Sequence, residues 1–282
     1  MATAMMRALA AHDERPELLG AVTLAELPLS EDRLAPLKDP GVRAWVMKNK
    51  IAPGAYEFMI ARTRFFDELA KHGLDERLPQ LVVLGAGYDS RAYRFRNLAG
   101  ATHIFELDAL PTQQRKREVL QRAGVPFPPH LQFVPIDFEA DDIEQVLMGA
   151  GFDREARALF LWEGVSYYLS LEAVNRMLAA VCSAAAPGTS IAFDYASVSA
   201  EALDEEGIQK LCGIMKSDHA AEPTKFGIPA GKLEPFLAKR GYEVVEKLGQ
   251  REMETRYLTL ADGTIAGKVP ALFSLVHART VA

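Results

Sequence analysis

The feature that most constrains the fold is an apolar run, LVVLG at residues 81–85, which leads directly into a Gly-x-Gly sequence. The run is long enough for one strand, and the absence of alternating polar residues indicates that both faces of that strand are buried. Gly85 and Gly87 let the main chain pass close to a ligand, because they carry no Cβ. This stretch therefore predicts a buried strand that ends at a binding site.

The remaining pattern is an alternation of strands and helices. Amphipathic stretches at 108–124, 141–151 and 170–188 are expected to be helices, the last with Ser170 as its N-cap. Apolar strands that alternate with such helices indicate βαβ units and a parallel sheet covered on both faces. The expected strands are 81–85, 103–108, 131–137, 158–164, 190–196, 242–248 and 271–278.

The connection between the last two strands differs from the others. Residues 249–270 show no strong helix pattern, and such a connection suits an antiparallel pair better than another crossover. The predicted fold class is therefore α/β, with a Rossmann-like sheet of seven strands whose last strand is antiparallel. Residues 1–80 are expected to form a helical N-terminal cap segment, and residues 81–282 the core, with a helical cap insertion at about 198–235.

Composition excludes several classes of protein. A formal net charge of −6 argues against a general nucleic-acid binder, and no apolar run reaches the roughly 18 residues that span a membrane. The apolar run near the N-terminus, Ala8–Ala11, is too short for a signal peptide. Cys182 and Cys212 form neither a disulfide framework nor a metal-ligand set. We therefore expect a cytoplasmic protein without a metal.

Carboxylates follow the next three expected strands. Open parallel sheets bind ligands beyond the carboxyl ends of their strands, and Asp108, Asp137 and Glu163 stand at these ends. Asp108 lies where a carboxylate accepts hydrogen bonds from ribose hydroxyls, although it could instead cap the following helix. NAD and S-adenosylmethionine both carry that ribose, so Asp108 does not distinguish between them.

The residues after the glycines favour a ligand without phosphates. A dinucleotide fingerprint would have a third small residue at position 90, which is Ser90, and the neighbouring Asp89 would repel a pyrophosphate if no cation offset it. S-adenosylmethionine carries no phosphate, and its amino and sulfonium groups are positively charged. This interpretation assumes that Asp89 has no cationic partner.

The two remaining carboxylates each have an alternative interpretation. Asp137 could accept from an adenine amino group while Phe138 packs on the base, or it could simply begin a helix. Glu163 stands within an apolar stretch, and burying it unpaired would be costly, so it requires a cation. The ammonium group of a ligand and Arg62 are the two candidates.

Five motifs in one order give the chain a family resemblance. LVVLGAGYDSRAYRF, FELD, PIDF, WEGVSYYLS and the upstream ARTRFFDE resemble the leucine carboxyl methyltransferase family, over residues 38 to about 196. The antiparallel end of the predicted sheet is likewise the plan of class I methyltransferases. That family includes an enzyme that methylates the C-terminal leucine of a protein phosphatase, and bacterial O-methyltransferases of polyketide and other small-molecule pathways.

The resemblance implies S-adenosylmethionine as the cofactor and a role for each motif. Arg62 would bind the methionine carboxylate, Gly85 would lie against the methionine moiety, and Glu163 would hold its amino end. Asp108 would hold the ribose, and Asp137 with Phe138 the adenine. The family's extended lid for a protein substrate has no obvious match here, which favours a small-molecule acceptor over a phosphatase.

The expected activity is O-methylation of a small, polyketide-like metabolite at a carboxylate or a hydroxyl. A carboxylate acceptor is already ionised at neutral pH, whereas a phenol would benefit from a general base. His219 and Tyr195 are the candidate bases, and both have other interpretations, as a loop residue and as a pocket wall. Two alternative functions stay open: an NAD(P)-dependent oxidoreductase, and a binding protein that retains the fold without turnover. The acceptor and the oligomeric state are not encoded in any motif.

Overall fold

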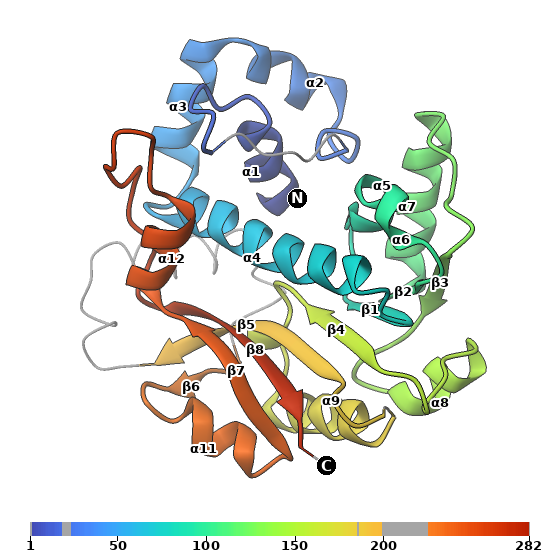
Figure 1. The fold of residues 1–282 in the computed structure, drawn as a ribbon. Coiled ribbons are helices and arrows are strands. Elements are labelled where there is room, and N and C mark those ends of the chain that lie inside the picture. The colour runs from blue at the N-terminus through green and yellow to red at the C-terminus, as the bar shows by residue number, and fades with distance from the viewer. Residues whose placement is uncertain (1, 19–23, 185, 199–224, 282) are drawn as a thin grey trace. The chain divides into compact units, whose positions relative to one another are not determined.

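The computed structural model describes residues 2–18, 24–184, 186–198 and 225–281 (Figure 1). Contacts divide the chain into two compact units, each of which draws on three stretches of sequence. The first unit comprises Met1–Phe65, Val198–Pro223 and Leu248–Phe273, and the second comprises Phe66–Ser197, Thr224–Lys247 and Ser274–Ala282. The second unit contains the glycine loop and the predicted strand-end carboxylates.

A single sheet organises the second unit. Its strands are β1 (Gln80–Leu84), β2 (His103–Asp108), β3 (Leu131–Pro135), β4 (Ala158–Trp162), β5 (Ser190–Val198), β6 (Ile228–Pro229), β7 (Tyr242–Leu248) and β8 (Phe273–Thr280). The order across the sheet is β3-β2-β1-β4-β5-β8-β7, with β6 paired to β5. β1 lies between β2 and β4 in parallel register, and reversal of the strand order at this point creates the switch at which ligands bind in such sheets.

The last strand runs against its neighbours, as predicted. The end of β8 lies beside the starts of β5 and β7, because Thr280 N donates to Thr189 O at 2.9 Å and Val281 N donates to Gly241 O at 2.9 Å. Figure 1 shows β8 and β5 pointing in opposite directions. All seven expected strands are therefore present, with ends displaced by one or two residues, and the fold class is confirmed.

The short strand β6 was not predicted. It lies in the stretch 198–235 that was expected to form a helical insertion, of which residues 199–224 lie outside the described residues. Ile228 is buried in the core beside Phe226, and the ring of Phe226 packs 5.8 Å from that of Phe236. Apolar contacts to the sheet therefore outweigh the local helix pattern at the end of this stretch.

Helices cover both faces of the sheet. The helices of the second unit are α5 (Arg91–Arg94), α6 (Arg96–Ala99), α7 (Leu110–Arg122), α8 (Ile143–Gly149), η2 (Ser166–Tyr168), α9 (Leu171–Ser183) and α11 (Leu233–Ala238), together with the end of α4 (Ala55–Asp75). Apolar side chains of α8, α9 and α11 share one core with alternate residues of the strands, among them Val82 and Phe160. Lys116 of α7 contacts Glu106 of β2, and Leu159 of β4 lies near Gly73 of α4, so these two helices cover the other face.

Side-chain caps fix where two of these helices begin. Ser170 accepts a hydrogen bond from Ala173 N at 3.1 Å, which confirms the predicted N-cap of α9. Asp142 caps α8 in the same way by accepting from Gln145 N. Each cap satisfies an amide that the helix leaves unpaired, and so favours the start of α8 after Asp142 and of α9 after Ser170.

The first unit joins chain segments that are far apart in the sequence. Its helices are α1 (Ala2–Ala10), α2 (Glu31–Leu34), η1 (Ala35–Lys38), α3 (Pro40–Lys50), the first part of α4, and α12 (Gln250–Tyr257). An added Cβ on Gly267 would lie 2.5 Å from Glu57 Oε1, and the ring of Phe58 stacks on that of Phe273 at 4.6 Å. The early helices were predicted, whereas α12 was not, because its short and strongly polar sequence lacks an apolar stripe.

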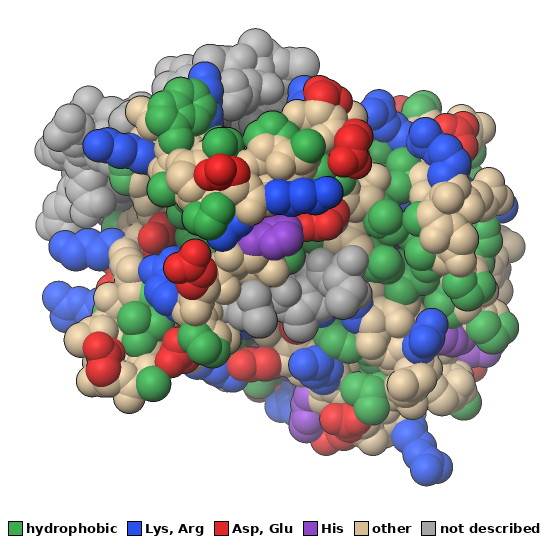
Figure 2. Space-filling model, turned by 90° about the horizontal axis from the view of Figure 1, so that it is seen from above, with side chains coloured by type: hydrophobic (Ala, Val, Ile, Leu, Met, Phe, Trp, Pro, Cys, Tyr) green, Lys and Arg blue, Asp and Glu red, His purple; other side chains and the backbone are tan. Residues whose placement is uncertain are grey.

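No helix within the described part of the chain is long and apolar enough to cross a membrane. Figure 2 shows acidic and basic side chains interspersed over the face it presents, without a continuous basic stripe among the coloured residues.

His277 of β8 gives a prediction about acid stability. Burial lowers its pKa to about 4, with Arg279 and His72 adding to this effect and Glu246 opposing it, and its Nε2 is buried without a partner among the described residues. Between pH 6.5 and 4 the unfolded chain thus binds a proton that the folded chain lacks, so stability decreases as the pH falls through this window. We expect His277→Gln to weaken this dependence, so that its Tm relative to wild type is higher at pH 5 than at pH 7.5. Parallel Tm curves for the two proteins across this range would contradict the assignment.

Candidate functional site

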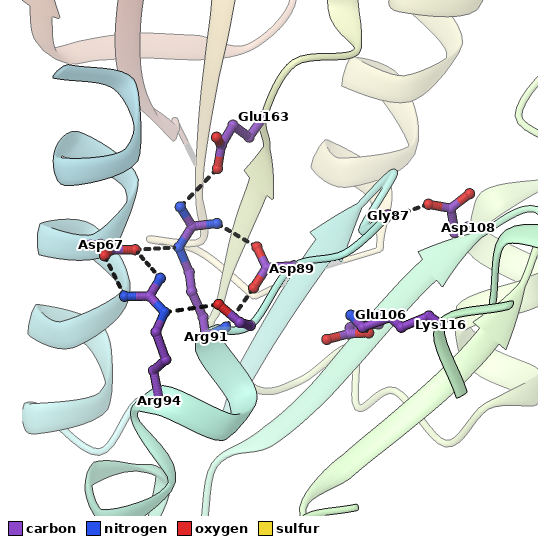
Figure 3. Close-up of polar contacts among 10 residues, drawn as sticks. Asp67, Gly87, Asp89, Arg91, Arg94, Glu106, Asp108, Lys116 and Glu163 are labelled. Carbon is purple, nitrogen blue, oxygen red and sulfur yellow. Dashed lines mark hydrogen bonds and ion pairs between the residues drawn. The ribbon is translucent and has the colours of Figure 1, made fainter. Parts of the chain in front are cut away.

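The glycine loop is joined directly to the end of the neighbouring strand. After β1, Gly85 and Gly87 adopt φ angles of +65° and +48°, which side chains other than glycine rarely adopt. Ala86 N donates to Leu107 O at 3.0 Å, and Gly87 N donates to Asp108 Oδ2 at 2.5 Å (Figure 3). The loop therefore turns over the end of β2, and Asp108 is a fixed part of that turn.

The two glycines serve different purposes. An added Cβ on Gly85 would lie 2.5 Å from Cγ2 of Val165. The space that a side chain at residue 85 would need is therefore occupied by Val165, in the loop after β4. An added Cβ on Gly87 would meet no atom closer than Gly85 O at 3.9 Å, so the backbone at Gly87 faces open space. Open space beside Asp108 is consistent with a ligand that approaches the main chain there.

Asp108 is a partly buried carboxylate with two amide donors. Its Oδ1 accepts from Ala109 N at 2.7 Å, in addition to the bond from Gly87 N to Oδ2. Burial raises the pKa of Asp108, while these two amides and the nearby Lys116 act in the opposite direction. The Thr112 side chain also donates to this carboxylate, whose two oxygens together offer about four acceptor positions, so one remains for a further hydroxyl group.

A buried ion pair lies just behind Asp108 on the same strand. Lys116 Nζ of α7 contacts Glu106 Oε2 at 2.5 Å, and both side chains are almost fully buried. Burial raises the pKa of Glu106 to about 7, and Lys116 opposes this rise while the charges of Asp89 and Asp108 add to it. Glu106 Oε1 is buried without a partner among the described residues. This pair brings a positive charge into the neighbourhood of Asp108.

Glu163 is paired with an arginine that sequence reasoning did not single out. Arg91 Nη2 donates to Glu163 Oε2 at 2.7 Å, and the Glu163 side chain is only 7% exposed (Figure 3). A buried carboxylate requires such a cation, and Arg91, which was not one of the two expected candidates, supplies one. Glu163 and the glycine loop are consequently joined through a single side chain.

The expectation that Asp89 lacks a cation is wrong. Arg91 Nη1 donates to Asp89 Oδ2, and the amide of Arg91 donates to Oδ1 at 2.7 Å. Asp89 is 7% exposed and is neutralised by this guanidinium rather than facing the loop as an uncompensated charge. The argument from Asp89 against a pyrophosphate ligand therefore does not hold, and the choice between cofactors has to rest on other observations.

The loop after β4 is held by β5. Gly164 N donates to Asp194 Oδ1 at 2.7 Å, and Ser166 Oγ donates to the carbonyl oxygen of Asp194. Asp194 is fully buried at the carboxyl half of β5. These bonds fix the backbone on both sides of Val165, which is the residue that contacts Gly85.

Comparison with known proteins identifies the family. The family model for leucine carboxyl methyltransferase matches residues 1–182. The chain belongs to the leucine carboxyl methyltransferase family. The match covers more than half of the chain and includes the glycine loop, Asp108 and Glu163.

Relatives with names of the same kind support the assignment. YktD of Bacillus subtilis strain 168, a candidate S-adenosyl-L-methionine-dependent methyltransferase, is 27% identical over 215 residues, which cover 76% of this chain and 69% of YktD. A relative from Mycobacterium sp. strain JLS with the same description is 32% identical over 201 residues, which cover 71% of this chain and 63% of that protein. The chain therefore spans about two thirds of the length of these relatives.

A solved structure shares the fold. The crystal structure of a candidate methyltransferase from Thermobifida fusca YX superposes with a TM-score of 0.60 at 17% identity, covering 99% of this chain and 94% of that one. At this identity the similarity concerns the fold alone. It agrees with the parallel sheet and antiparallel last strand described above.

Two residues that the leucine carboxyl methyltransferase resemblance places at the adenine lie after β3. Ile136 N donates to Asp108 O at 3.0 Å, which brings this loop to the end of β2. Asp137 is exposed, and its Oδ1 accepts from Glu139 N at 2.9 Å in a local turn. It does not begin a helix, since Asp142 caps α8, while Phe138 packs partly against the core.

Three further predicted residues have different outcomes. Arg62 lies on the part of α4 that belongs to the first unit, so its place at the site stays a prediction. Tyr195 is 3% exposed within the core, and burial raises its pKa to about 12, which makes it a poor general base at neutral pH. His219 lies outside the described residues.

Sequence reasoning missed Arg91, Lys116 and Asp67. Each of them makes a buried ion pair with a residue at least ten positions away or on another element, so no local pattern reveals the partner. The signal that could have revealed these partners is a charged residue within an apolar stretch, because a buried charge requires a partner of opposite sign. Glu163 was recognised as needing a cation, and Arg91 stands inside the motif LVVLGAGYDSRAYRF that sequence reasoning quoted.

The contact between Gly85 and Val165 gives a prediction about stability. Gly85→Ala would force both a left-handed residue and a clash, so we expect a loss of about 2–4 kcal/mol in the free energy of unfolding. Gly124→Ala is the matched control, because Gly124 has φ +67° and no atom lies within 4 Å of its added Cβ. It should cost only the roughly 1–2 kcal/mol of the backbone conformation.

Adding Val165→Ala tests the clash directly. In a double-mutant cycle measured by urea unfolding, the cost of Gly85→Ala should fall to that of Gly124→Ala once Val165 is truncated. Equal costs of Gly85→Ala with and without Val165 would show that this contact does not constrain the loop.

Proposed function

We propose that the chain binds S-adenosylmethionine at the carboxyl ends of β1, β2 and β4 and transfers its methyl group to an oxygen of a small-molecule metabolite. The observation that carries the proposal is the bond from Gly87 N to Asp108, which holds a carboxylate beside a glycine whose Cα faces open space. A ribose needs such an acceptor for its hydroxyls, and the family membership makes S-adenosylmethionine the ligand that fits it.

The proposed contacts follow the strand ends. Asp108 would accept from the ribose hydroxyls, and Asp137 with Phe138 would contact the adenine. Gly85 and Gly87 would lie against the methionine part, whose ammonium Glu163 would hold. Arg62 would bind the methionine carboxylate. These residues suit S-adenosylmethionine, because the carboxylates of the site would face the positive amino and sulfonium groups of the cofactor.

The chain's own contribution to transfer is alignment. When bound, S-adenosylmethionine supplies a methyl group on a sulfonium, which is a good leaving group. The protein then has to fix the donor, orient the acceptor and exclude water, and the rigid loops after β1 and β4 serve the first of these tasks. This explains why the site is built from backbone contacts and buried ion pairs.

The acceptor that fits best is one that is already ionised. Of the two predicted bases, Tyr195 is buried with its pKa raised to about 12. A carboxylic acid with a pKa near 4 needs no base at neutral pH, whereas a phenol with a pKa near 10 does. We therefore propose a small carboxylate as the acceptor, with a hydroxyl as the second candidate and a polyketide-like skeleton as the substrate class.

The binding step can be tested by calorimetry with two ligands. We expect the protein to bind S-adenosylhomocysteine and not NAD. Asp108→Asn should weaken that binding by about tenfold, because an amide offers one acceptor oxygen where the carboxylate offers two to Gly87 N, Ala109 N and the ribose. Asp153→Asn is the matched control, since Asp153 makes a similar turn by accepting from Glu155 N but lies near the start of β1, next to Gln80. Binding of NAD without S-adenosylhomocysteine would instead favour an oxidoreductase.

Turnover requires a separate experiment. Methyl-labelled S-adenosylmethionine should label small carboxylic acids in preference to phenols in a panel of acceptors at pH 7. A protein that binds S-adenosylhomocysteine yet labels no member of a broad panel or cell extract would fit the third alternative, a binding protein without turnover.

A further inference from the structure

Arg91 makes one contact from each nitrogen of its guanidinium. Nε donates to Asp67 Oδ1 at 2.8 Å, Nη2 donates to Glu163 Oε2 at 2.7 Å, and Nη1 donates to Asp89. The side chain is 2% exposed, and it lies over the ring of Phe66 at 5.7 Å. Figure 3 shows the three carboxylates arranged around this one group.

The three carboxylates belong to three different parts of the second unit. Asp67 is on α4, Asp89 follows the glycine loop, and Glu163 follows β4. Asp67 is itself held from the other side, because Arg94 Nη1 and Nη2 donate to its two oxygens at 2.6 and 2.8 Å. Arg91 therefore joins the loop to Glu163 and anchors both to a helix.

These three contacts require an arginine at position 91 and could not be made by a lysine. The guanidinium is planar, always charged and presents its donors in fixed directions, whereas a lysine ammonium is a single point that cannot reach three separated carboxylates. Arg91 donates to Glu163 with one of its three nitrogens and to two other carboxylates with the rest. The two other contacts fix the guanidinium, and the fixed guanidinium orients Glu163. The amide of Arg91 also donates to Asp89, so the loop is held by backbone and side chain together.

We infer that Arg91 is a positioning residue for the amino-acid end of the cofactor. It holds Glu163 and the glycine loop at the separation that the methionine part of S-adenosylmethionine occupies. The inference rests on the proposed function, and it assigns to Arg91 no contact with the cofactor itself. Its consequence is selective: losing Arg91 should impair recognition of the methionine part and spare that of the nucleoside.

Two ligands distinguish recognition of the methionine part from recognition of the nucleoside. S-adenosylhomocysteine carries the amino acid, whereas methylthioadenosine carries the same adenine, ribose and sulfur without it. In calorimetry, Arg91→Lys should weaken S-adenosylhomocysteine binding by about tenfold and methylthioadenosine binding by less than about twofold. In steady-state assays the KM for S-adenosylmethionine should rise more than kcat falls, because the altered contact is one of binding.

Control variants address folding. Arg240→Lys removes another arginine of the same unit, which donates to Asn175 and to Phe236 O away from the strand ends, and it should change neither affinity. Should Arg91→Lys fail to fold, Asp67→Asn offers a milder change that keeps the contacts of Arg91 to Asp89 and Glu163. It should weaken S-adenosylhomocysteine binding by about threefold, again without affecting methylthioadenosine.

The outcomes are distinct. If the wild-type protein binds neither ligand, the proposed function fails. If wild type binds both and Arg91→Lys binds S-adenosylhomocysteine equally well, or loses both ligands equally with a folded structure, then Arg91 has only a structural role and the inference is overturned. An unchanged ratio of the two affinities in Asp67→Asn would overturn it in the same way.

Discussion

Burial of the Arg91 charge is the constraint on which the rest of the site depends. An isolated cation inside a protein loses its hydration, and only well-placed anions can restore that loss. Arg91 finds three of them, on α4, on the glycine loop and after β4. Segments that are 24 and 72 positions away in the sequence are thereby brought to one point. Removing any one anion would leave part of the charge uncompensated, so the parts of the site are interdependent.

A second set of contacts operates on the β2 side. Asp108 accepts from the backbone of Gly87, while the buried pair of Glu106 and Lys116 lies behind it on the same strand. The positive charge of Lys116 opposes the rise in the pKa of Asp108 that burial causes. Asp108 is thus oriented by a backbone amide, whereas Asp89 and Glu163 are oriented by Arg91.

The sheet was predictable because its signals are local, whereas the ion pairs were not. Apolar runs, the cap at Ser170 and the glycines at the end of β1 each reveal themselves within a few residues. β6 and α12 were missed, since two residues of strand and a polar helix carry too little periodicity. Asp89 was misinterpreted for a further reason: its charge was recognised, but Arg91, only two positions away, was not considered as its partner. The strand ends were thus predictable as positions, and their electrostatics were not.

The composition of the first unit has a consequence for synthesis on the ribosome. Gly54, Glu57 and Phe58 pack against Lys268, Gly267 and Phe273, so residues made first are completed by residues made roughly two hundred positions later. Chains usually fold domain by domain from the N-terminus as they emerge. Here the start of α4 has to wait for these residues, and the parallel strands β1 to β5 can pair before it. Residues 54–58 therefore reach their final neighbours only after most of the sheet has been synthesised.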